Sequence, residues 1–556
     1  MGIARTRLKG TAPPDVRPAA VLGGAALAIV ATVAIGLALQ GGPPNRASRG
    51  SSVAGSSSSR SSTPIGPAPE QSQRYPPSPG EPSVSPAPPE PVVPIVGFWS
   101  IDRTISSANL RLALTGRDSA FSQVLVAEPD LAALADALGI EPNAAVRQLP
   151  AAAVIAAVED RTDVLGLIRA EDVVPAVRAI GIDGRMLFGD ARVRTLSGWP
   201  LTIRSPRQAG MVSGADAGFD PASTWTLVAA GDVMNDRSVY REAVILDRGP
   251  DFSWAGGTAR IVRRTCCTGG LTTVEATRTG NAGALAALFR DADLALVNHE
   301  GPTPNTFTYH PTGLTFSFDP ALEAGIRNAG VDLVSLANNH IRNAGSIGVL
   351  QTLANVRAAG LVPVGAGATL DAANAPAWFS IDGVRVAVLA FDAINLGANG
   401  ATATRPGAAP LDLDRARADL QAARRAGAQV VVVIPHWGVE YTSRPTASQR
   451  AAAAALIADG ADVILGSHPH WAGAIEAIGS GVVVYSMGDF IFDLPRSEQT
   501  DEGLVVELSF VGPRLAQIEI HPTIELDRSQ PNLLDPADGQ VILDRIRTVS
   551  RDFLPW

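Results

Sequence analysis

The sequence predicts an α/β fold, and two patterns in its second half lead to this prediction. Six apolar runs end abruptly in polar residues, and they lie at residues 226–230, 293–297, 331–336, 429–434, 462–465 and 482–485. Helix-type patterns lie between several of them, at residues 346–359, 412–426 and 446–458. Continuous apolar runs of this length are typical of strands buried on both faces of a sheet. Strands that alternate with helices indicate an α/β domain.

The composition excludes several classes of protein. The chain has 556 residues, with 45 Lys+Arg against 54 Asp+Glu, and therefore a net charge of -9 without a basic block. Such a chain is a poor nucleic-acid binder, and we exclude that class. Two cysteines are too few for a disulfide-rich scaffold or a cysteine-based zinc module. At about 100–200 residues per domain, several parts are expected.

Residues 19–40 predict a transmembrane anchor. The 21 residues from 19 to 39 are uncharged and mostly apolar, and as a helix they would span about 31 Å, close to the thickness of a bilayer core. Four basic residues precede the run and two follow it. This bias predicts that residues 1–18 are cytoplasmic and that the folded domains of this single-pass cell-membrane protein lie outside. A cleaved signal peptide is the alternative, but the run is long and lacks a small-x-small cleavage site.

Two further segments separate the anchor from the α/β domain. Residues 41–94 predict a disordered linker, because 14 Pro and 13 Ser between residues 43 and 94 leave few large apolar side chains to bury. Residues 95–215 predict a small α/β accessory domain, with helix-type patterns at residues 129–138 and 173–180. This accessory region contains no group of residues typical of catalysis.

Polar residues gather at the ends of the predicted strands. Taken singly, each has a structural explanation, such as a turn, a helix cap or a satisfied buried histidine. Ligands of α/β domains bind at the carboxyl ends of strands, however, so clusters far apart in sequence would converge there. Five of the seven histidines lie in these clusters, which chance placement would rarely produce, and they are His299, His340, His436, His468 and His470.

These clusters suit a site for one or two divalent metal ions. The candidate ligands are Asp232, Glu300, Asn339, His436, His468 and His470. A set of carboxylates, an amide and imidazoles without thiolate fits Mn, Fe or Zn better than Ca or Mg. Glu300 could bridge two ions about 3.5–4 Å apart, which would activate water for attack on a phosphoryl group. His340 is a candidate acid that could protonate the leaving oxygen.

The ordered motifs resemble those of a known family. The motifs GDVM, NHE, SLANNH, PHWGVEY, GADVILGSHPH and VYSMGDFIFD are similar to those of CapA-type capsule and poly-γ-glutamate biosynthesis proteins. These resemble calcineurin-like metallophosphoesterases in turn. The resemblance covers residues 223–525 and leaves residues 526–556 as a C-terminal tail. It implies a four-layer α/β/β/α metallophosphatase-like sandwich, membrane anchoring, and a role with polymer synthase or export proteins in making an anionic surface polymer.

All seven candidate residues occupy positions expected from the resemblance, but nearby positions depart from it. Met234 stands where the related enzymes have a histidine, so one metal site would be short of a ligand. Asn343 replaces a carboxylate near His340, and a histidine without such a partner holds its proton less well. Asp489 and His299 replace Asn and Leu, and they could partly restore the ability to bind metal.

Three functions stay open from the sequence. The first is a membrane-anchored CapA-like protein of surface-polymer biosynthesis with a metallophosphoesterase-like site. The second is a metal-dependent phosphomonoester or phosphodiester hydrolase unrelated to polymer synthesis. The third is a non-catalytic scaffold of a polymer synthase or exporter complex, with residues 95–215 as the partner contact.

The adjacent pair Cys266 and Cys267 has two open interpretations. A disulfide between neighbouring residues requires a strained geometry, but the predicted extracytoplasmic location permits oxidation. A disulfide that shapes a loop and two free thiols therefore stay equally open. A metal-binding role is disfavoured, because no further soft ligand lies near in the sequence.

Overall fold

The computed structural model describes residues 88–553 apart from residues 118–119, 206–217 and 269–270, and these described residues belong to one compact unit. The predicted cytoplasmic segment, the anchor and nearly all of the predicted linker lie outside the described residues. Within the described ranges, no helix is long and apolar enough to cross a membrane.

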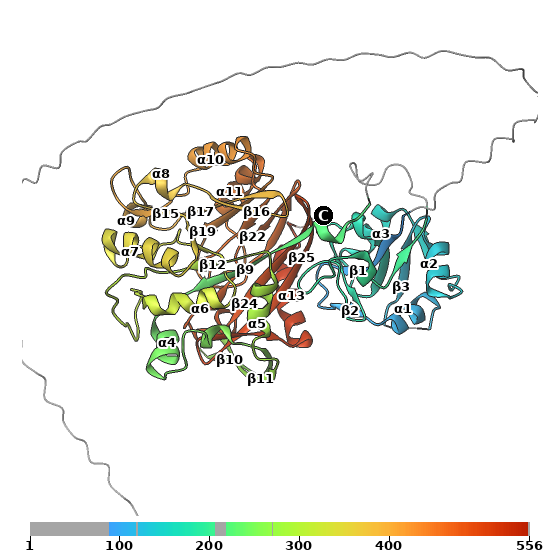
Figure 1. Ribbon diagram of the computed structural model, residues 1–556. Helices are drawn as coiled ribbons and strands as arrows, with labels where there is room; N and C mark the ends of the chain where they lie inside the picture. Colours follow the sequence, from blue (N-terminus) through green and yellow to red (C-terminus); the bar gives the residue numbers. More distant parts are fainter. Residues whose placement is uncertain (1–87, 118–119, 206–217, 269–270, 554–556) are drawn as a thin grey trace, which may run out of the picture. The chain divides into compact units, whose positions relative to one another are not determined.

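The first part of the described chain forms a sheet of its own, here called the N-terminal sheet (Figure 1). Its strands run in the order β4-β3-β5-β1-β6, and β8 pairs with β1. They are β1 (Glu90–Gly97), β3 (Gln123–Ala127), β4 (Arg147–Leu149), β5 (Val164–Arg169), β6 (Val177–Ala179) and β8 (Thr202–Ile203). The helices are α1 (Ser107–Leu114), α2 (Leu131–Leu138) and α3 (Ala151–Val158), and a separate pair is formed by β2 (Thr104–Ile105) and β7 (Gly181–Ile182).

Two predictions for this region need correction. The linker was expected to continue to residue 94, but β1 begins at Glu90 and is buried throughout, because Val92 and Val93 enter the core of the N-terminal sheet. Residues 173–180 were predicted as a helix, yet they contain strand β6. Pro175 disfavours a helix, since it lacks a backbone N–H and its ring clashes with the preceding turn. Helix α2 confirms the pattern at residues 129–138.

Residues 224–550 contain two larger sheets. Sheet I runs in the order β11-β10-β26-β25-β24-β9-β12-β13-β14, with β23 beside β9, and sheet II in the order β16-β17-β19-β20-β22-β21. The strands of sheet I are β9 (Thr224–Val233), β10 (Thr258–Thr268), β11 (Leu271–Gly280), β12 (Leu294–His299), β13 (Leu333–Ser335), β14 (Val362–Val364), β23 (Asp489–Ile491), β24 (Glu502–Val511), β25 (Arg514–Leu526) and β26 (Gln530–Leu534). Those of sheet II are β16 (Ala377–Ile381), β17 (Val384–Asp392), β19 (Val430–His436), β20 (Val463–Leu465), β21 (Ile475–Ile478) and β22 (Gly481–Val484).

Helices cover the outer faces of the two sheets, and the mixed α/β prediction is confirmed. Leu227 of β9 belongs to the core between the sheets, whereas its neighbour Val228 packs with α5 and α7 outside sheet I, because successive strand residues face opposite ways. Helices α10 and α11 pack on the outer face of sheet II. The main helices are α5 (Ala284–Asp291), α6 (Glu323–Asn328), α7 (Gly345–Ala358), α10 (Leu413–Arg425), α11 (Ala447–Ala458) and α13 (Pro536–Ser550), with shorter α4 (Arg237–Tyr240), α8 (Leu370–Ala373), α9 (Leu396–Asn399) and α12 (Glu498–Asp501).

Helices α7, α10 and α11 confirm the three predicted helical patterns to within a residue or two. Side chains cap two of them: Asp412 accepts from the first turn of α10, and Thr446 forms a capping box with Gln449 at α11. Such caps satisfy N–H groups that have no partner inside the helix. The six predicted apolar runs all contain strands.

The C-terminal segment is part of the core, contrary to the predicted tail at residues 526–556. Strand β26 pairs with both β25 and β10. Ile542, Leu543 and Ile546 of α13 are at most 2% exposed and join the core between the sheets. Their spacing places them on one face of the helix, which explains why α13 packs there. The domain therefore extends beyond residue 525.

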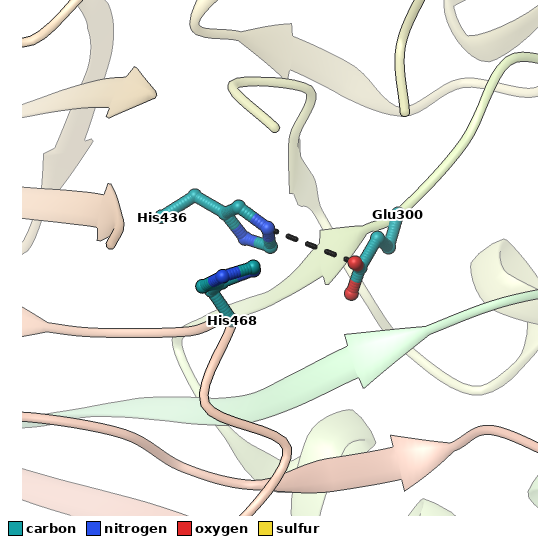
Figure 2. Close-up of side chains that lie close together, drawn as sticks. All are labelled: Glu300, His436 and His468. Atoms are coloured by element: carbon teal, nitrogen blue, oxygen red, sulfur yellow. Dashed lines mark ion pairs between the residues drawn. The ribbon is translucent and has the colours of Figure 1, made fainter. Parts of the chain in front are cut away.

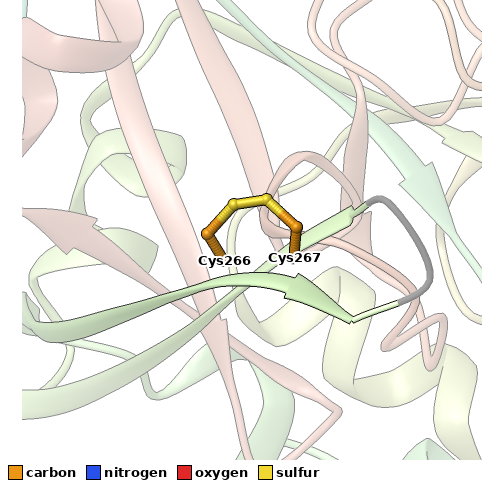
Figure 3. The surroundings of a disulfide bond; sticks show 2 residues. All are labelled: Cys266 and Cys267. Atoms are coloured by element: carbon orange, nitrogen blue, oxygen red, sulfur yellow. A yellow bond between two sulfur atoms is a disulfide. The ribbon is translucent and has the colours of Figure 1, made fainter.

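The hairpin of β10 and β11 carries the two cysteines. Cys266 and Cys267 are joined by a disulfide near the end of β10 (Figure 3). Both residues are exposed. Of the two open interpretations, the structure has the disulfide.

Candidate metal centre

The predicted site residues meet where strands of both sheets end. Asp232 lies near the end of β9 and Glu300 directly follows β12. His436 is the last residue of β19, and the His468 loop follows β20. Because β9, β12 and β13 are parallel to one another, as are β17, β19, β20 and β22, their carboxyl ends lie at a common edge in each sheet.

One group of side chains consists of Glu300, His436 and His468, here called the first triad. Each offers one ligand atom, and these atoms lie within 4.8 Å of one another. Figure 2 shows the three side chains facing a common point, with Nε2 of His436 3.6 Å from Oε1 of Glu300. The three side chains are therefore close enough to bind one ion.

Asp232, Glu300 and His470 form the second triad, again with ligand atoms within 4.8 Å of one another. Nδ1 of His470 lies 3.6 Å from Oδ2 of Asp232. The two histidines of the His-x-His segment thus serve different triads. Both have backbone φ angles in the left-handed region, 97° for His468 and 58° for His470. Strained backbone of this kind is concentrated at functional sites.

Glu300 belongs to both triads, and its environment fits a bound cation. Its side chain is fully buried, and neither carboxylate oxygen has a hydrogen-bond partner. Nδ1 of His468 is also buried without a partner. Unpaired buried polar atoms are costly, and native proteins rarely keep them without a ligand, an ion or water. The donor set present therefore fits one or two divalent cations.

Burial and neighbouring charges set the protonation of the centre. Burial, together with the carboxylate of Asp232, raises the pKa of Glu300 well above its usual range. Burial lowers the pKa of His436 well below its usual range and that of His468 to about 3, so both rings are neutral, as metal ligands must be. For His470 the carboxylates of Asp489 and Asp232 outweigh burial and raise the pKa to about 9. A divalent cation would therefore displace protons from Glu300 and His470.

Asn339 and His340 lie at the edge of the first triad. Oδ1 of Asn339 accepts from Nε2 of His436 at 2.8 Å. Nδ1 of His340 is 3.0 Å from Oδ1 of Asn343, and this oxygen also accepts from the backbone of Phe316. Nδ1 of His340 is therefore the protonated nitrogen, and its unprotonated Nε2 lies 3.8 Å from Glu300. Burial lowers the pKa of His340 to about 4, and the hydrogen bond to Asn343 opposes this shift only in part.

His299 does not reach the centre, which corrects the expectation that it could add to the metal ligands. Its Nε2 lies 2.8 Å from Glu323 and its Nδ1 3.0 Å from the carbonyl of Gly301. Neighbouring strand residues point to opposite faces, so His299 faces away where Asn298 and Glu300 face inward.

Asn298 is a site residue that the sequence analysis missed. Its Nδ2 donates to Oδ1 of Asp232 at 2.7 Å and lies 3.3 Å from Nδ1 of His436. The amide therefore links one member of each triad. The signal was present in the sequence, because Asn298 stands two positions before Glu300, and side chains two positions apart in an extended chain point to the same side.

Comparison with known proteins identifies relatives of the α/β domain. Residues 226–494 match the family model described as bacterial capsule synthesis protein PGA_cap. The chain is 35% identical over 184 residues to the capsule biosynthesis protein CapA of Bacillus anthracis, which is 32% of this chain and 44% of that protein. It is 31% identical over 221 residues to the PGA biosynthesis protein CapA of Bacillus subtilis, 39% of this chain and 58% of that protein. The matches thus span about half the length of these curated relatives.

Solved structures show weaker likeness. The calcineurin-like phosphoesterase YfkN of Bacillus subtilis is 12% identical with a TM-score of 0.28, covering 59% of this chain and 97% of that chain. The NAD nucleotidase NadN of Haemophilus influenzae is 14% identical with a TM-score of 0.31, and the match covers 58% of this chain and 56% of that chain. The fold is established by the sheets and cores described above.

Proposed function

Because residues 226–494 carry a domain of the PGA_cap family of capsule synthesis proteins, we propose that the chain acts in making or exporting an anionic surface polymer such as poly-γ-glutamate. The names of the Bacillus relatives, capsule biosynthesis and PGA biosynthesis proteins, support this role. Because the net charge is -9, the protein surface as a whole would repel an anionic polymer. A role at a local site is therefore favoured.

We further propose that the local site is a two-metal centre for phosphoryl chemistry. The single observation that supports it most is Glu300, a fully buried carboxylate with two unpartnered oxygens that belongs to both triads. Glu300 would bridge the ions, His436 and His468 would hold one, and Asp232 and His470 the other. Mn, Fe or Zn suits this donor set. When bound, two such ions stabilise the charge on a phosphoryl group under attack.

His340 would act as the general acid that protonates the leaving group. Its side chain is 15% exposed and its Nε2 lies 3.8 Å from Oε1 of Glu300, so it borders the centre. Its Nε2 is unprotonated in the free protein, because burial lowers the pKa to about 4. An approaching phosphoryl anion favours the protonated ring and raises that pKa. Nε2 would then take up a proton and pass it to the leaving oxygen.

We place the protein at the cell membrane, anchored through residues 19–40, with its folded part outside the cell. The apolar run and its flanking charges support this placement. Protease treatment of intact cells is expected to remove the folded part from the cell surface. Full protection of residues 88–556 in intact cells, with cleavage after lysis, would contradict the topology.

Cells that lack the gene test the function. Deletion is expected to abolish the cell-bound anionic polymer, and the full-length wild-type protein to restore it. A His468→Ala variant is expected to restore only about one tenth to one hundredth of the polymer, since loss of groups around a metal centre costs about 10–100-fold in activity. His521→Gln is the matched control, because His521 is buried against Glu507 outside both triads.

The outcomes of this experiment separate the alternatives. An unchanged amount of polymer after deletion contradicts the proposed role and leaves a hydrolase with another substrate. Full restoration by His468→Ala, with the protein present at normal levels, supports a scaffold in which the metal centre has no part.

A further inference from the structure

Asp489 is held beside Asp232 by the main chain. Strand β23 runs parallel to β9, and Asp489 and Asp232 are direct partners in its register. A Cβ atom at Gly231 would collide with the carbonyl oxygen of Gly488, so glycine is needed there for the two strands to approach this closely. The carboxylate at 489 is therefore positioned by the backbone next to the second triad.

The side-chain contacts of Asp489 also place it next to the second triad. Its Oδ1 lies 2.7 Å from Nδ1 of His470, the nitrogen that is 3.6 Å from Oδ2 of Asp232. The Asp489 side chain is 1% exposed, and its Oδ2 is buried without a hydrogen-bond partner. Two adjacent buried carboxylates are unfavourable unless a positive charge lies beside both. Without metal, protonated His470 supplies that charge, but it contacts only Oδ1 of Asp489 and leaves Oδ2 free for a cation.

Met234 is the nearest residue after Asp232 in the sequence with an atom that could bind a metal, but its side chain makes other contacts. Its sulfur accepts from the backbone N–H of Asp236 at 3.2 Å, and its side chain packs with Phe316 and Phe318. The second triad alone offers three protein ligands, one of them shared with the first triad. Within the described residues, Asp489 is the carboxylate that contacts a member of this triad and still has a free oxygen.

We propose that Asp489 is a fourth protein ligand of the ion held by Asp232, Glu300 and His470. The inference rests on the proposed two-metal centre and deepens it. It makes the two halves of the centre chemically different: the first is rich in imidazole and the second in carboxylate. Carboxylate oxygens favour Mn²⁺, whereas imidazoles suit Zn²⁺ and the later transition metals. The second half is therefore assigned to an ion such as Mn²⁺.

Mn²⁺ binding to the full-length protein tests the assignment. After removal of metal with a chelator, titration with Mn²⁺ is expected to show two equivalents for the wild type. An Asp489→Asn variant keeps the shape and can still accept from His470, but it loses the charge. It is expected to bind one equivalent as before and the second at least about tenfold more weakly.

Asp392→Asn is the matched control. Asp392 is a buried aspartate at the end of β17, beside His436 in the register, and its Oδ2 is also unpartnered, but it belongs to neither triad. This control is expected to bind both equivalents. Two unweakened equivalents in Asp489→Asn would overturn the assignment. If that variant binds no Mn²⁺, Asp489→Glu decides, since return of the second equivalent supports the ligand role and its absence overturns it.

The same titration separates this inference from the function on which it rests. A wild-type protein that binds no Mn²⁺, Fe²⁺ or Zn²⁺ contradicts the metal centre as a whole. A wild type with two equivalents and an Asp489→Asn variant with two unweakened equivalents contradicts only the role of Asp489.

Discussion

A Glu300→Gln variant is expected to lose both metal ions and to stay folded. Glu300 is the one residue common to the two triads, so its loss removes a ligand from each ion at once. Removal of a group around a metal site weakens metal binding by about 10–100-fold. Because Glu300 is shared, its removal would weaken the binding of both ions. Burial and Asp232 raise the pKa of Glu300, which means that the metal-free fold disfavours its charge, and glutamine removes that charge. Metal content and thermal unfolding in the presence of a chelator measure the two effects.

Glu323→Gln provides the matched comparison. Glu323 is an equally buried glutamate near β12, but its partners are His299 and Thr303, which face away from the centre. This variant is expected to keep its metal. If Glu300→Gln binds as much metal as the wild type, Glu300 is not a bridging ligand.

An Arg178→Ala variant is expected to lose about 3–5 kcal/mol of stability, because one partner of a buried ion pair is left without the other. Arg178 of β6 lies 2.9 Å from Glu519 of β25, and the two side chains are 3% and 2% exposed. Burial would raise the pKa of Glu519, but Arg178 and Arg103 outweigh it and lower the pKa to about 2. The remaining contact of Glu519 with Arg103 favours the lower end of this range. Denaturant-induced unfolding of the full chain measures the change.

Arg161→Ala is the control for this prediction. Arg161 forms an ion pair with Asp163 in which both side chains are about half exposed. Exposed pairs contribute about 0–1 kcal/mol, so little loss is expected. Equal stabilities of the two variants would mean that the link between the N-terminal sheet and sheet I contributes little to folding.

The sequence predicted the positions of strands and helices better than the surfaces against which they pack. The run that forms β9 was recognisable because every residue in it before Asp232 is apolar or small. Because parallel strands end at a common edge of a sheet, the polar residues that follow such runs were expected to lie close together. Helix α13 was missed, although Ile542, Leu543 and Ile546 have helical spacing. Its partner surface is assembled from strands of both sheets, and no local pattern reveals that surface.

Within the candidate site, residue types were predictable but pairings were not. His299 and Glu300 are neighbours in the sequence, yet strand alternation sends them to opposite faces. The division of His468 and His470 between two triads depends on two unusual backbone angles, which composition does not reveal. The role of Asn298 depends on the distance between Asp232 and His436, which lie on strands of different sheets.

The metal content of the purified full-length protein tests the central claim most directly. Protein produced in medium that contains Mn, Fe and Zn, and dialysed without chelator, is measured by elemental analysis. The shared carboxylate and the two triads predict about two divalent ions per chain. A folded protein with no bound transition metal would contradict the metal centre and the phosphoryl chemistry proposed for it.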